Sequence, residues 1–289
     1  MSEFLTTKEV AALLRIKERK VYDLAARNAI PCAKATGKLL FPKAEIRHWM
    51  QEKGVVSDST NLPKSVVLGS HDPVLEWALS ASGSGLPTLF SGSYDGITRF
   101  NRREGVVCSI HIENQQSDGW NTEVVQQELK GSPCVLLHWA KRERGLLVKP
   151  GERIHSFADI VGRRIVVRQA AAGSQQAFER RLQQAGISSG DLEIGRQAQT
   201  ETEAALTILE GQADATFGLR CFADRYQLDF IPVCIESYDL IVDRHAYFEP
   251  EFQALLNFTH SGEFATEVRR YVGYDITDNG KILFNSPRA

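Results

Sequence analysis

The stretch LTTKEVAALLRIKERKVYDLAARNAIP, residues 5–31, contains two helical patterns joined by a short turn. Thr6 and Glu9 have the spacing of a capping box, and the apolar residues that follow share one helical face, which predicts a first helix. A second pattern restarts at Lys17, with Val21 on its inner face and cations on its outer face. Two helices joined by a turn of about 3–4 residues, with cations at the start of the second, form the arrangement that places a recognition helix in the major groove of DNA.

The segment that follows predicts a β-wing and a third helix. Residues 33–41 form two short extended runs about a turn that contains Gly37 and Lys38. A helical pattern then starts at Pro42 and continues to Met50, and proline is favoured at the first position of a helix. The order of these elements predicts a small winged domain over residues 1–53.

Four strings in this region, LTTKEVAALL, KVYDL, IPCAK and FPKAEIRHW, resemble in order the MerR/excisionase-type winged helix-turn-helix. The resemblance covers roughly residues 4–52. It implies double-stranded DNA as a partner, and it implies that four residues of the second helix face DNA while a wing residue contacts a phosphate. These residues are Lys17, Arg19, Lys20 and Tyr22 on the helix and Lys38 on the wing.

The charges are divided unevenly along the chain. Residues 1–53 hold 11 of the 34 Lys and Arg residues but only 6 of the 36 Asp and Glu residues, so this part has a net charge of +5 and the remainder has −7. A small basic module joined to a larger acidic one is typical of a protein whose first part approaches phosphates and whose second part does not.

Residues 54–64, GVVSDSTNLPK, predict a linker because they are rich in Gly, Ser, Asp, Asn and Pro and show neither helical nor strand periodicity. Beyond them, short apolar runs alternate with amphipathic helical patterns, which predicts an α/β domain with a mostly parallel sheet over residues 65–289. In open sheets of this kind, ligands bind beyond the carboxyl ends of the strands. The loops that follow the strands are therefore the places to look for a site.

Three such loops combine small or hydroxyl residues with the start of a helix, where free N–H groups can receive an anion. The first loop, GSHDP, follows a strand at 66–68, the second, SGSYDG, follows a strand at 89–90, and the third, RQAAAGSQQ, follows a strand at 165–167. In the first loop, a role as helix N-cap is an equally good reading for the Ser or Asp side chain. The candidate ligand-binding residues are Ser70, His71, Ser91, Ser93, His111, Arg168, Gly173, Ser174 and Tyr238.

These loops, with ERGLLV at 143–148 and ESYDL at 236–240, resemble in order the periplasmic-binding-protein-like effector domain found behind helix-turn-helix or molybdopterin-biosynthesis modules. The resemblance covers about residues 65–265 and implies a two-lobed type II solute-binding fold, with strands that cross between the lobes near 145–148 and 238–242. Molybdate-type relatives show a loop like NRQxGSGTR, whereas this chain has VRQAAAGSQQ and lacks the second cation. The ligand is therefore left open between a molybdate- or tungstate-like oxyanion and an organic metabolite.

The five cysteines are scattered and form no CxxC pair, so the sequence predicts neither a disulfide framework nor a metal site. It shows no export signal and no apolar run near the ~20 residues needed to cross a bilayer, so we expect a cytoplasmic protein without a membrane partner. Nucleophile elbows, Walker loops and zinc-protease motifs are missing, which argues against an enzyme and gives no reason to expect a cofactor.

Together these patterns predict a one-component transcription regulator in which a small ligand binds between two lobes and alters operator binding. An oxyanion-like anion is one candidate for this ligand. Because one winged domain contacts few base pairs, we expect a homodimer on paired half-sites. Two alternatives stay open. One is an architectural DNA protein of the excisionase type, and the other is a cytoplasmic ligand-binding protein without a role in gene regulation.

Overall fold

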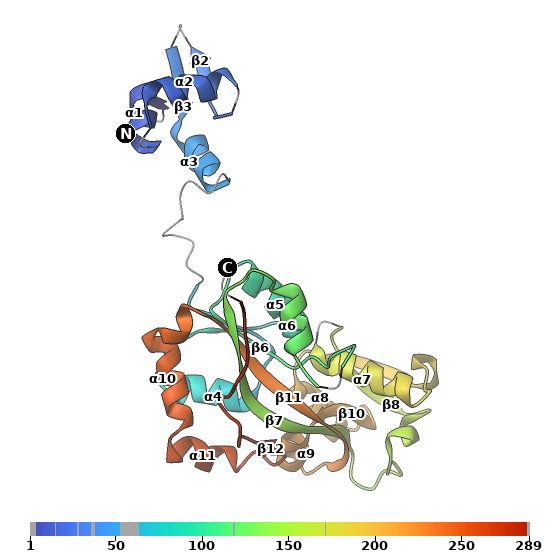
Figure 1. The fold of residues 1–289 in the computed structure, drawn as a ribbon. Helices are drawn as coiled ribbons and strands as arrows, with labels where there is room; N and C mark the ends of the chain where they lie inside the picture. Colours follow the sequence, from blue (N-terminus) through green and yellow to red (C-terminus); the bar gives the residue numbers. More distant parts are fainter. Residues whose placement is uncertain are drawn as a thin grey trace. The chain divides into compact units, whose positions relative to one another are not determined.

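The computed structural model describes residues 4–14, 16–27, 29–35, 38–52, 64–117, 119–170 and 172–287. The chain forms two compact units, Met1–Leu62 and Pro63–Ala289, which are best considered one at a time. Figure 1 shows a small helical unit with a short sheet and a larger unit built on a long sheet.

Among its described residues, the smaller unit has three helices and a three-stranded antiparallel sheet in the order β1-β3-β2. Val10, Val21, Phe41 and Ile46 are fully buried and form its core. The predicted capping box is present, since Glu9 N–H donates to Thr6 Oγ1 at 3.3 Å and Thr6 N–H donates to Glu9 Oε2 at 2.7 Å. The elements are β1 (Phe4–Thr6), α1 (Thr7–Leu14), α2 (Glu18–Ala26), β2 (Ala33–Ala35), β3 (Lys38–Pro42) and α3 (Lys43–Glu52).

The larger unit is organised by a mixed sheet whose main path runs β5-β4-β6-β11-β7-β10-β8-β9. The strands on either side of the centre pair in parallel, as expected for β-α-β units, while β11 and β7 run antiparallel between them. The strands are β4 (Val67–Gly69), β5 (Thr88–Phe90), β6 (Val107–Ile110), β7 (Cys134–Val148), β8 (Arg164–Arg168), β9 (Glu193–Ala198), β10 (Ala215–Leu219), β11 (Asp229–Asp243), β12 (Tyr274–Asp275) and β13 (Ile282–Asn285).

Two long strands join the two halves of this sheet. Strands β7 and β11 pair along their whole lengths, and each contributes to both halves (Figure 1). At one end β11 pairs with β6, and at the other end β7 pairs with β10. The predicted crossings at 145–148 and 238–242 are thus the end portions of two 15-residue strands. The prediction of a mostly parallel sheet is wrong, because these connecting strands pair antiparallel.

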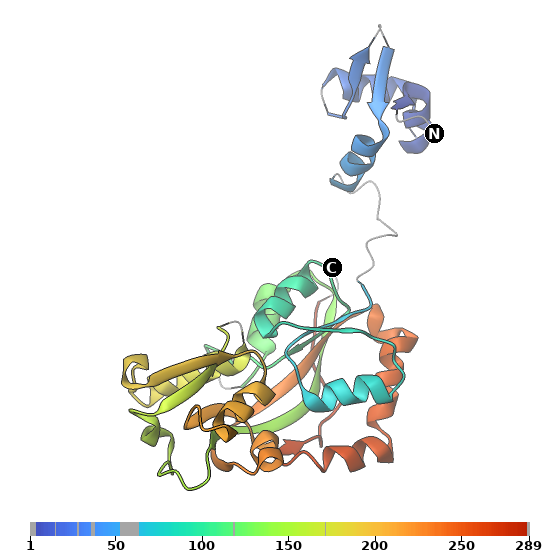
Figure 2. The same ribbon diagram turned by 180° about the vertical axis from the view of Figure 1, so that it is seen from behind.

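Helices cover both halves of the sheet, as Figures 1 and 2 show from opposite sides. The first lobe carries α4 (Pro73–Ala81), α5 (Ser93–Asn101), α6 (Thr122–Glu128), α10 (Pro250–Thr259) and α11 (Gly262–Val268). The second lobe carries α7 (Gly173–Gln184), α8 (Glu201–Leu209) and α9 (Arg220–Tyr226). None of the helices within the described part of the chain is long and apolar enough to cross a membrane.

Glycines hold α5 tightly against β4 where the first ligand loops begin. Gly69 has a φ of +104°, and a Cβ there would lie 2.1 Å from the Ser109 carbonyl oxygen. A Cβ on Gly96 would lie 2.5 Å from the Gly69 Cα. Only glycine fits this left-handed conformation and this close approach. The packing therefore fixes the ends of β4 and β6 next to the start of α5.

Candidate functional site

A cavity of about 140 Å³ lies between the two lobes, beyond the carboxyl ends of β4 and β5 and next to β8. Its volume is about ten times the ~10–15 Å³ that a cavity needs to hold one water molecule, which suits a ligand of a few heavy atoms. The lining residues come from five loops, and they are Ser70, His71, Phe90, Gly92, His111, Arg168, Gln169, Ala172, Ser174, Gln199, Thr200 and Glu201.

Five of the candidate ligand residues lie in the cavity wall: Ser70, His71, His111, Arg168 and Ser174. Ser93 and Tyr238 lie behind the wall and position Ser70. The Ser70 and Ser93 hydroxyls are 2.7 Å apart, and the Tyr238 hydroxyl donates to the Ser70 carbonyl at 2.5 Å. The candidate set therefore comprises both direct wall residues and residues that hold the wall in place.

Two further candidates have other surroundings. The Ser91 hydroxyl donates to Asp95, which in turn accepts a hydrogen bond from Arg99 Nε at 2.7 Å, so this serine is engaged within the start of α5. Gly173 begins α7 and lies against the first lobe, because a Cβ at this position would be 2.7 Å from the His111 carbonyl oxygen. This glycine permits the close contact between the lobes.

A chain of buried charges lies behind the cavity and links both lobes through β7 and β11. Glu236 accepts hydrogen bonds from Arg144 Nε at 2.7 Å and from Arg142, and all three side chains are almost inaccessible to solvent. Arg142 also contacts Asp72 at 2.8 Å, and Arg144 contacts Glu201 at 2.9 Å. Burial alone raises the pKa of the Glu236 carboxyl, but Arg142 and Arg144 outweigh it and hold this pKa well below its ordinary value.

Arg168 provides a cation in the cavity wall. Its guanidinium donates to the carbonyl oxygens of Ala198 and Gln199 at 3.2 and 2.9 Å, and its Nη1 lies 3.9 Å from Glu201 Oε1. Burial lowers the pKa of Arg168 from a very high ordinary value, so the group keeps its charge. Beside it, α7 begins at Gly173, and its N-cap residue, Ala172, provides no side-chain cap. A guanidinium and an uncapped helix N-terminus together favour an anionic group.

His111 enters the same cavity from the end of β6. Its Nδ1 lies 3.1 Å from Glu236 Oε2, and the side chain is 5% exposed. Burial lowers the pKa of His111 despite the neighbouring carboxylate. Burial thus favours the neutral form of the ring.

The sequence patterns did not predict the part of the cavity wall that Gln199, Thr200 and Glu201 form. These residues follow β9, whose residues are exposed except for the last one, Ala198. A strand without an apolar run gives no signal in the sequence, and the loop after it escapes notice. The Thr200 side chain accepts from Glu203 N–H at 3.0 Å and caps α8, which places Glu201 at the first helical position beside the cavity.

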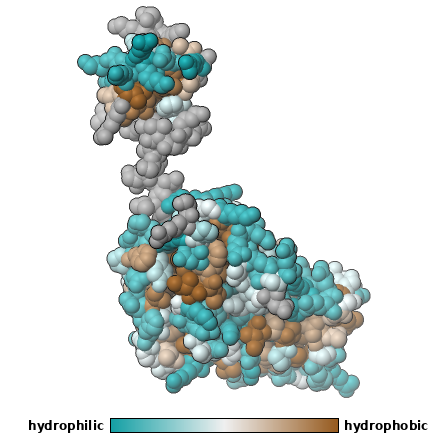
Figure 3. Space-filling model, viewed as in Figure 1, coloured by the Kyte–Doolittle hydropathy of each residue, from teal (hydrophilic) through white to brown (hydrophobic). Residues whose placement is uncertain are grey.

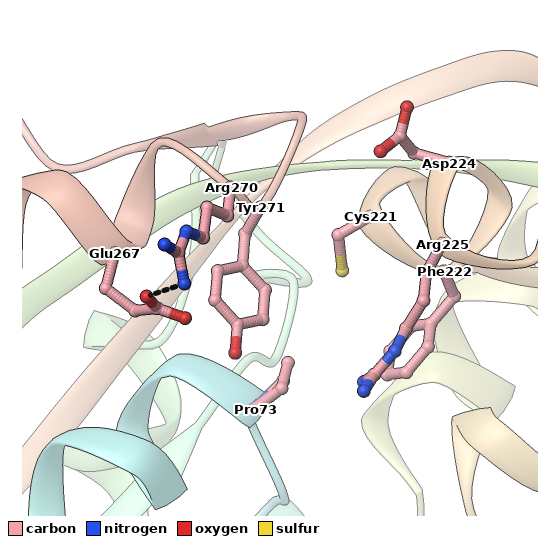
Figure 4. Close-up of a pocket in the computed structure, with 8 residues that line it drawn as sticks. All are labelled: Pro73, Cys221, Phe222, Asp224, Arg225, Glu267, Arg270 and Tyr271. Carbon is pink, nitrogen blue, oxygen red and sulfur yellow. Dashed lines mark hydrogen bonds and ion pairs between the residues drawn. The ribbon is translucent and has the colours of Figure 1, made fainter.

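A second crevice, of about 240 Å³, lies between α9 and the α4 and α11 region. Figure 4 shows Glu267 and Arg270 paired with each other on one side, and Cys221 and Arg225 on the other. Burial raises the pKa of the Cys221 thiol well above its ordinary value, which removes it as a nucleophile. The ligand residues expected from the sequence all lie elsewhere.

Within the described ranges, no group of three or more His, Cys, Asp or Glu side chains is arranged to hold a metal ion.

The candidate DNA-facing residues of α2 lie on the surface of the smaller unit. Lys17 is the N-cap residue of α2, and Lys17, Arg19 and Lys20 are all exposed. The Tyr22 side chain is 52% exposed. Hydrophilic side chains cover much of the face of this unit seen in Figure 3. Lys38 begins β3, while Gly37 at the expected tip lies outside the described residues.

A short helical unit with an exposed cationic second helix, followed by a two-lobed unit with a cavity between its lobes, defines a class of protein: a helix-turn-helix joined to a solute-binding-protein-like domain. The model of the PBP superfamily domain matches residues 76–260, and the chain belongs to this superfamily. A helix-turn-helix domain model matches residues 4–54. The first domain is of a type that binds DNA, the second is of a type that binds small ligands, and neither is an enzyme family.

The chain is similar along its length to a protein of Bacillus subtilis (strain 168) called uncharacterized protein YvgK, with 22% identity over 303 residues, 97% of this chain and 98% of the relative. A Clostridium pasteurianum protein, described by its position in the 5′ region of a 2Fe-2S ferredoxin gene, is 29% identical over 89 residues, 30% of this chain and 79% of the relative. Among solved structures, a putative phosphate transporter substrate-binding protein from Clostridium perfringens matches with a TM-score of 0.55 and 10% identity. This match covers 73% of this chain and 98% of the other, and it shows the shared fold.

Proposed function

We propose that this protein is a ligand-responsive, DNA-binding transcription regulator in the cytoplasm, in which a small anion bound between the two lobes alters operator binding. The observation that carries the proposal is the cavity itself. Ser70 and His111 of the first lobe and Arg168 and Ser174 of the second lobe line the same space. A ligand that contacts both lobes favours their closed arrangement, and such a two-state element is what regulation requires.

The anionic character of the ligand follows from the wall. Arg168 supplies a guanidinium, α7 supplies an uncapped N-terminus, and Ser70 and Ser174 supply hydroxyl groups. Charge-assisted hydrogen bonds are roughly twice as strong as neutral ones, so Arg168 is the main anchor in this proposal.

Arg168→Ala tests this ligand site. We expect the variant to bind anions at least about tenfold more weakly, the loss of one charged contact of roughly 1.5–3 kcal/mol. Ligand-free DNA binding should be unchanged. Calorimetric titration with phosphate, molybdate and glycolate, followed by DNA binding with and without each anion, measures both effects. Arg196→Ala is the matched control, because Arg196 is 69% exposed and lies on β9 outside the cavity wall. Wild-type anion affinity in Arg168→Ala would place the ligand site elsewhere.

The proposal for DNA binding rests on α2. The double variant Arg19→Ala/Lys20→Ala should bind a mixed-sequence duplex at least about tenfold more weakly and reduce the salt dependence of binding by about two units of slope, because each cation neutralises a phosphate. Both side chains are exposed, so the melting temperature should be unchanged. Fluorescence anisotropy at several salt concentrations measures the effect, with Arg27→Ala at the C-terminal end of α2 as control.

Equal affinity of the double variant and the wild type at physiological salt would remove α2 from the DNA interface.

The proposal also includes two chains on paired half-sites, since one recognition helix contacts few base pairs. Sedimentation of the same complexes counts the chains on each duplex. If the wild type binds DNA but anions do not change its affinity, the alternative of an architectural DNA protein is favoured. If the wild type does not bind DNA, the alternative of a ligand-binding protein without a role in gene regulation is favoured.

A further inference from the structure

One ring nitrogen in the cavity wall is placed to accept a hydrogen bond. The Nδ1 of His111 lies 3.1 Å from the Glu236 carboxylate, which has no proton to give. Nδ1 must therefore carry the proton, and in a neutral ring this leaves Nε2 with a lone pair. A Cβ on Gly173 would lie 3.2 Å from Nε2, so this edge of the ring faces the start of α7, where Ala172 and Ser174 on either side of Gly173 line the cavity.

The charges around the cavity are balanced before any ligand enters. Three guanidinium groups face three carboxylates in one connected set, which comprises Arg142, Arg144, Arg168, Asp72, Glu201 and Glu236. Burial raises the pKa of the Glu201 carboxyl, but Arg144, Arg168 and Arg142 together outweigh it and hold this pKa below its ordinary value. Glu201 is thus an ionised carboxylate in the cavity wall, and a ligand with two full negative charges is repelled by it more strongly than a ligand with one.

A further acceptor in the wall has no partner. The carboxamide oxygen of Gln169 is shielded from solvent and has no hydrogen bond to any described residue. Gln169 lines the same cavity as His111 and Glu201. Buried acceptors without partners are costly, so this side of the cavity is short of hydrogen-bond donors.

We propose that the cavity selects a small anion that carries its own O–H or N–H donor, such as a protonated oxyanion or a hydroxy- or amino-carboxylate, over a fully ionised tetrahedral dianion, with the donor directed to His111 Nε2. This inference rests on the proposed anion-binding function. The hydrogen-bond acceptors in the cavity wall define the class of ligand, and His111 is the residue that determines the specificity of binding.

Two matched pairs of anions test the proposal with the full-length protein. Phosphate and sulfate share a tetrahedral shape, but at pH 7 only phosphate retains a proton, and glycolate differs from acetate by one hydroxyl group. Isothermal titration should give an affinity about tenfold higher for the donor-bearing member of each pair, which is the effect of about one additional hydrogen bond. Molybdate should behave as sulfate does.

The variant His111→Phe keeps a ring in place and leaves Glu236 its two arginines, so the preference within each pair should fall to about twofold or less. His138→Phe is the control, because His138 is also 5% exposed with Nδ1 on a carboxylate, Asp239 at 2.7 Å, but lies outside the cavity wall. Its effect on the preference should be nil.

Equal or tighter binding of sulfate and molybdate by the wild type would overturn this inference while leaving anion binding in place. A preference that survives in His111→Phe would overturn the role of His111. If none of the five anions bound, the anionic cavity of the proposed function would fail, and this inference would fail with it.

Discussion

A Glu236→Gln variant is expected to have a free energy of unfolding lower by about 3–5 kcal/mol, because removing one partner of a buried ion pair leaves uncompensated charge in the interior. Glu236 is fully buried and accepts hydrogen bonds from Arg142, Arg144 and His111. The glutamine side chain has the same shape but turns one acceptor oxygen into a donor group that faces two guanidinium groups. The loss is therefore larger than that of a single neutral hydrogen bond.

Urea denaturation followed by circular dichroism measures this change as a lower midpoint with an unchanged slope. Glu143→Gln is the matched control on the adjacent strand, because the Glu143 pair with Arg220 is 2.7 Å long but 34% and 43% exposed at its two ends. An exposed pair of this kind is worth about 0–1 kcal/mol. Similar losses in the two variants would show that the buried charges do not stabilise the fold as the structure indicates.

The pH dependence of this contribution has a definite sign. Because the two arginines hold the pKa of Glu236 well below its ordinary value in the folded chain, the unfolded chain takes up the proton first as pH falls. The stabilisation is thus fully present above the ordinary pKa of glutamate and is lost as pH falls through the lower folded value. The difference between wild type and Glu236→Gln should shrink accordingly in acid.

Gly173→Val is expected to weaken anion binding by about 100-fold, because forcing extra carbon atoms into a packed contact costs up to about 3 kcal/mol. A Cβ at Gly173 would lie 2.7 Å from the backbone carbonyl oxygen of His111, and a backbone atom cannot move aside as a side-chain end can. The substitution should hold α7 of the second lobe away from the end of β6 in the first lobe. Ser174 and Arg168 would then no longer face Ser70 across the cavity.

Titration with phosphate and glycolate measures this effect, and DNA affinity without ligand should stay unchanged. Gly190→Val is the control in the same lobe, because a Cβ there would meet only the Ser188 hydroxyl at 3.7 Å. If Gly173→Val bound either anion as the wild type does, the contact between α7 and His111 would not be needed for the bound arrangement.

Local patterns in the sequence were sufficient for the order and type of many elements. The capping box at Thr6 and Glu9 predicted α1, and the apolar run before Arg168 predicted β8 and the start of α7. Such signals work because a helix cap or an amphipathic face depends on residues within one or two turns of each other. For the same reason the helix-turn-helix and its relatives could be recognised from strings of a few residues.

Only the tertiary structure shows which charged side chains are buried and which of them form ion pairs. The segment HWAKRERG at 138–145 has the composition of an exposed strand, yet Arg142 and Arg144 are 1% and 0% exposed. The antiparallel register of β7 and β11 places Glu236 opposite Arg142, 94 residues away in the chain, and the exposed strand β9 brings Glu201 to the same place. The sequence by itself determined the two-unit plan and the loops that follow apolar strands, because those features depend on near neighbours. Which buried charges pair, and which acceptors face the cavity, depended on contacts between distant strands that no local pattern encodes.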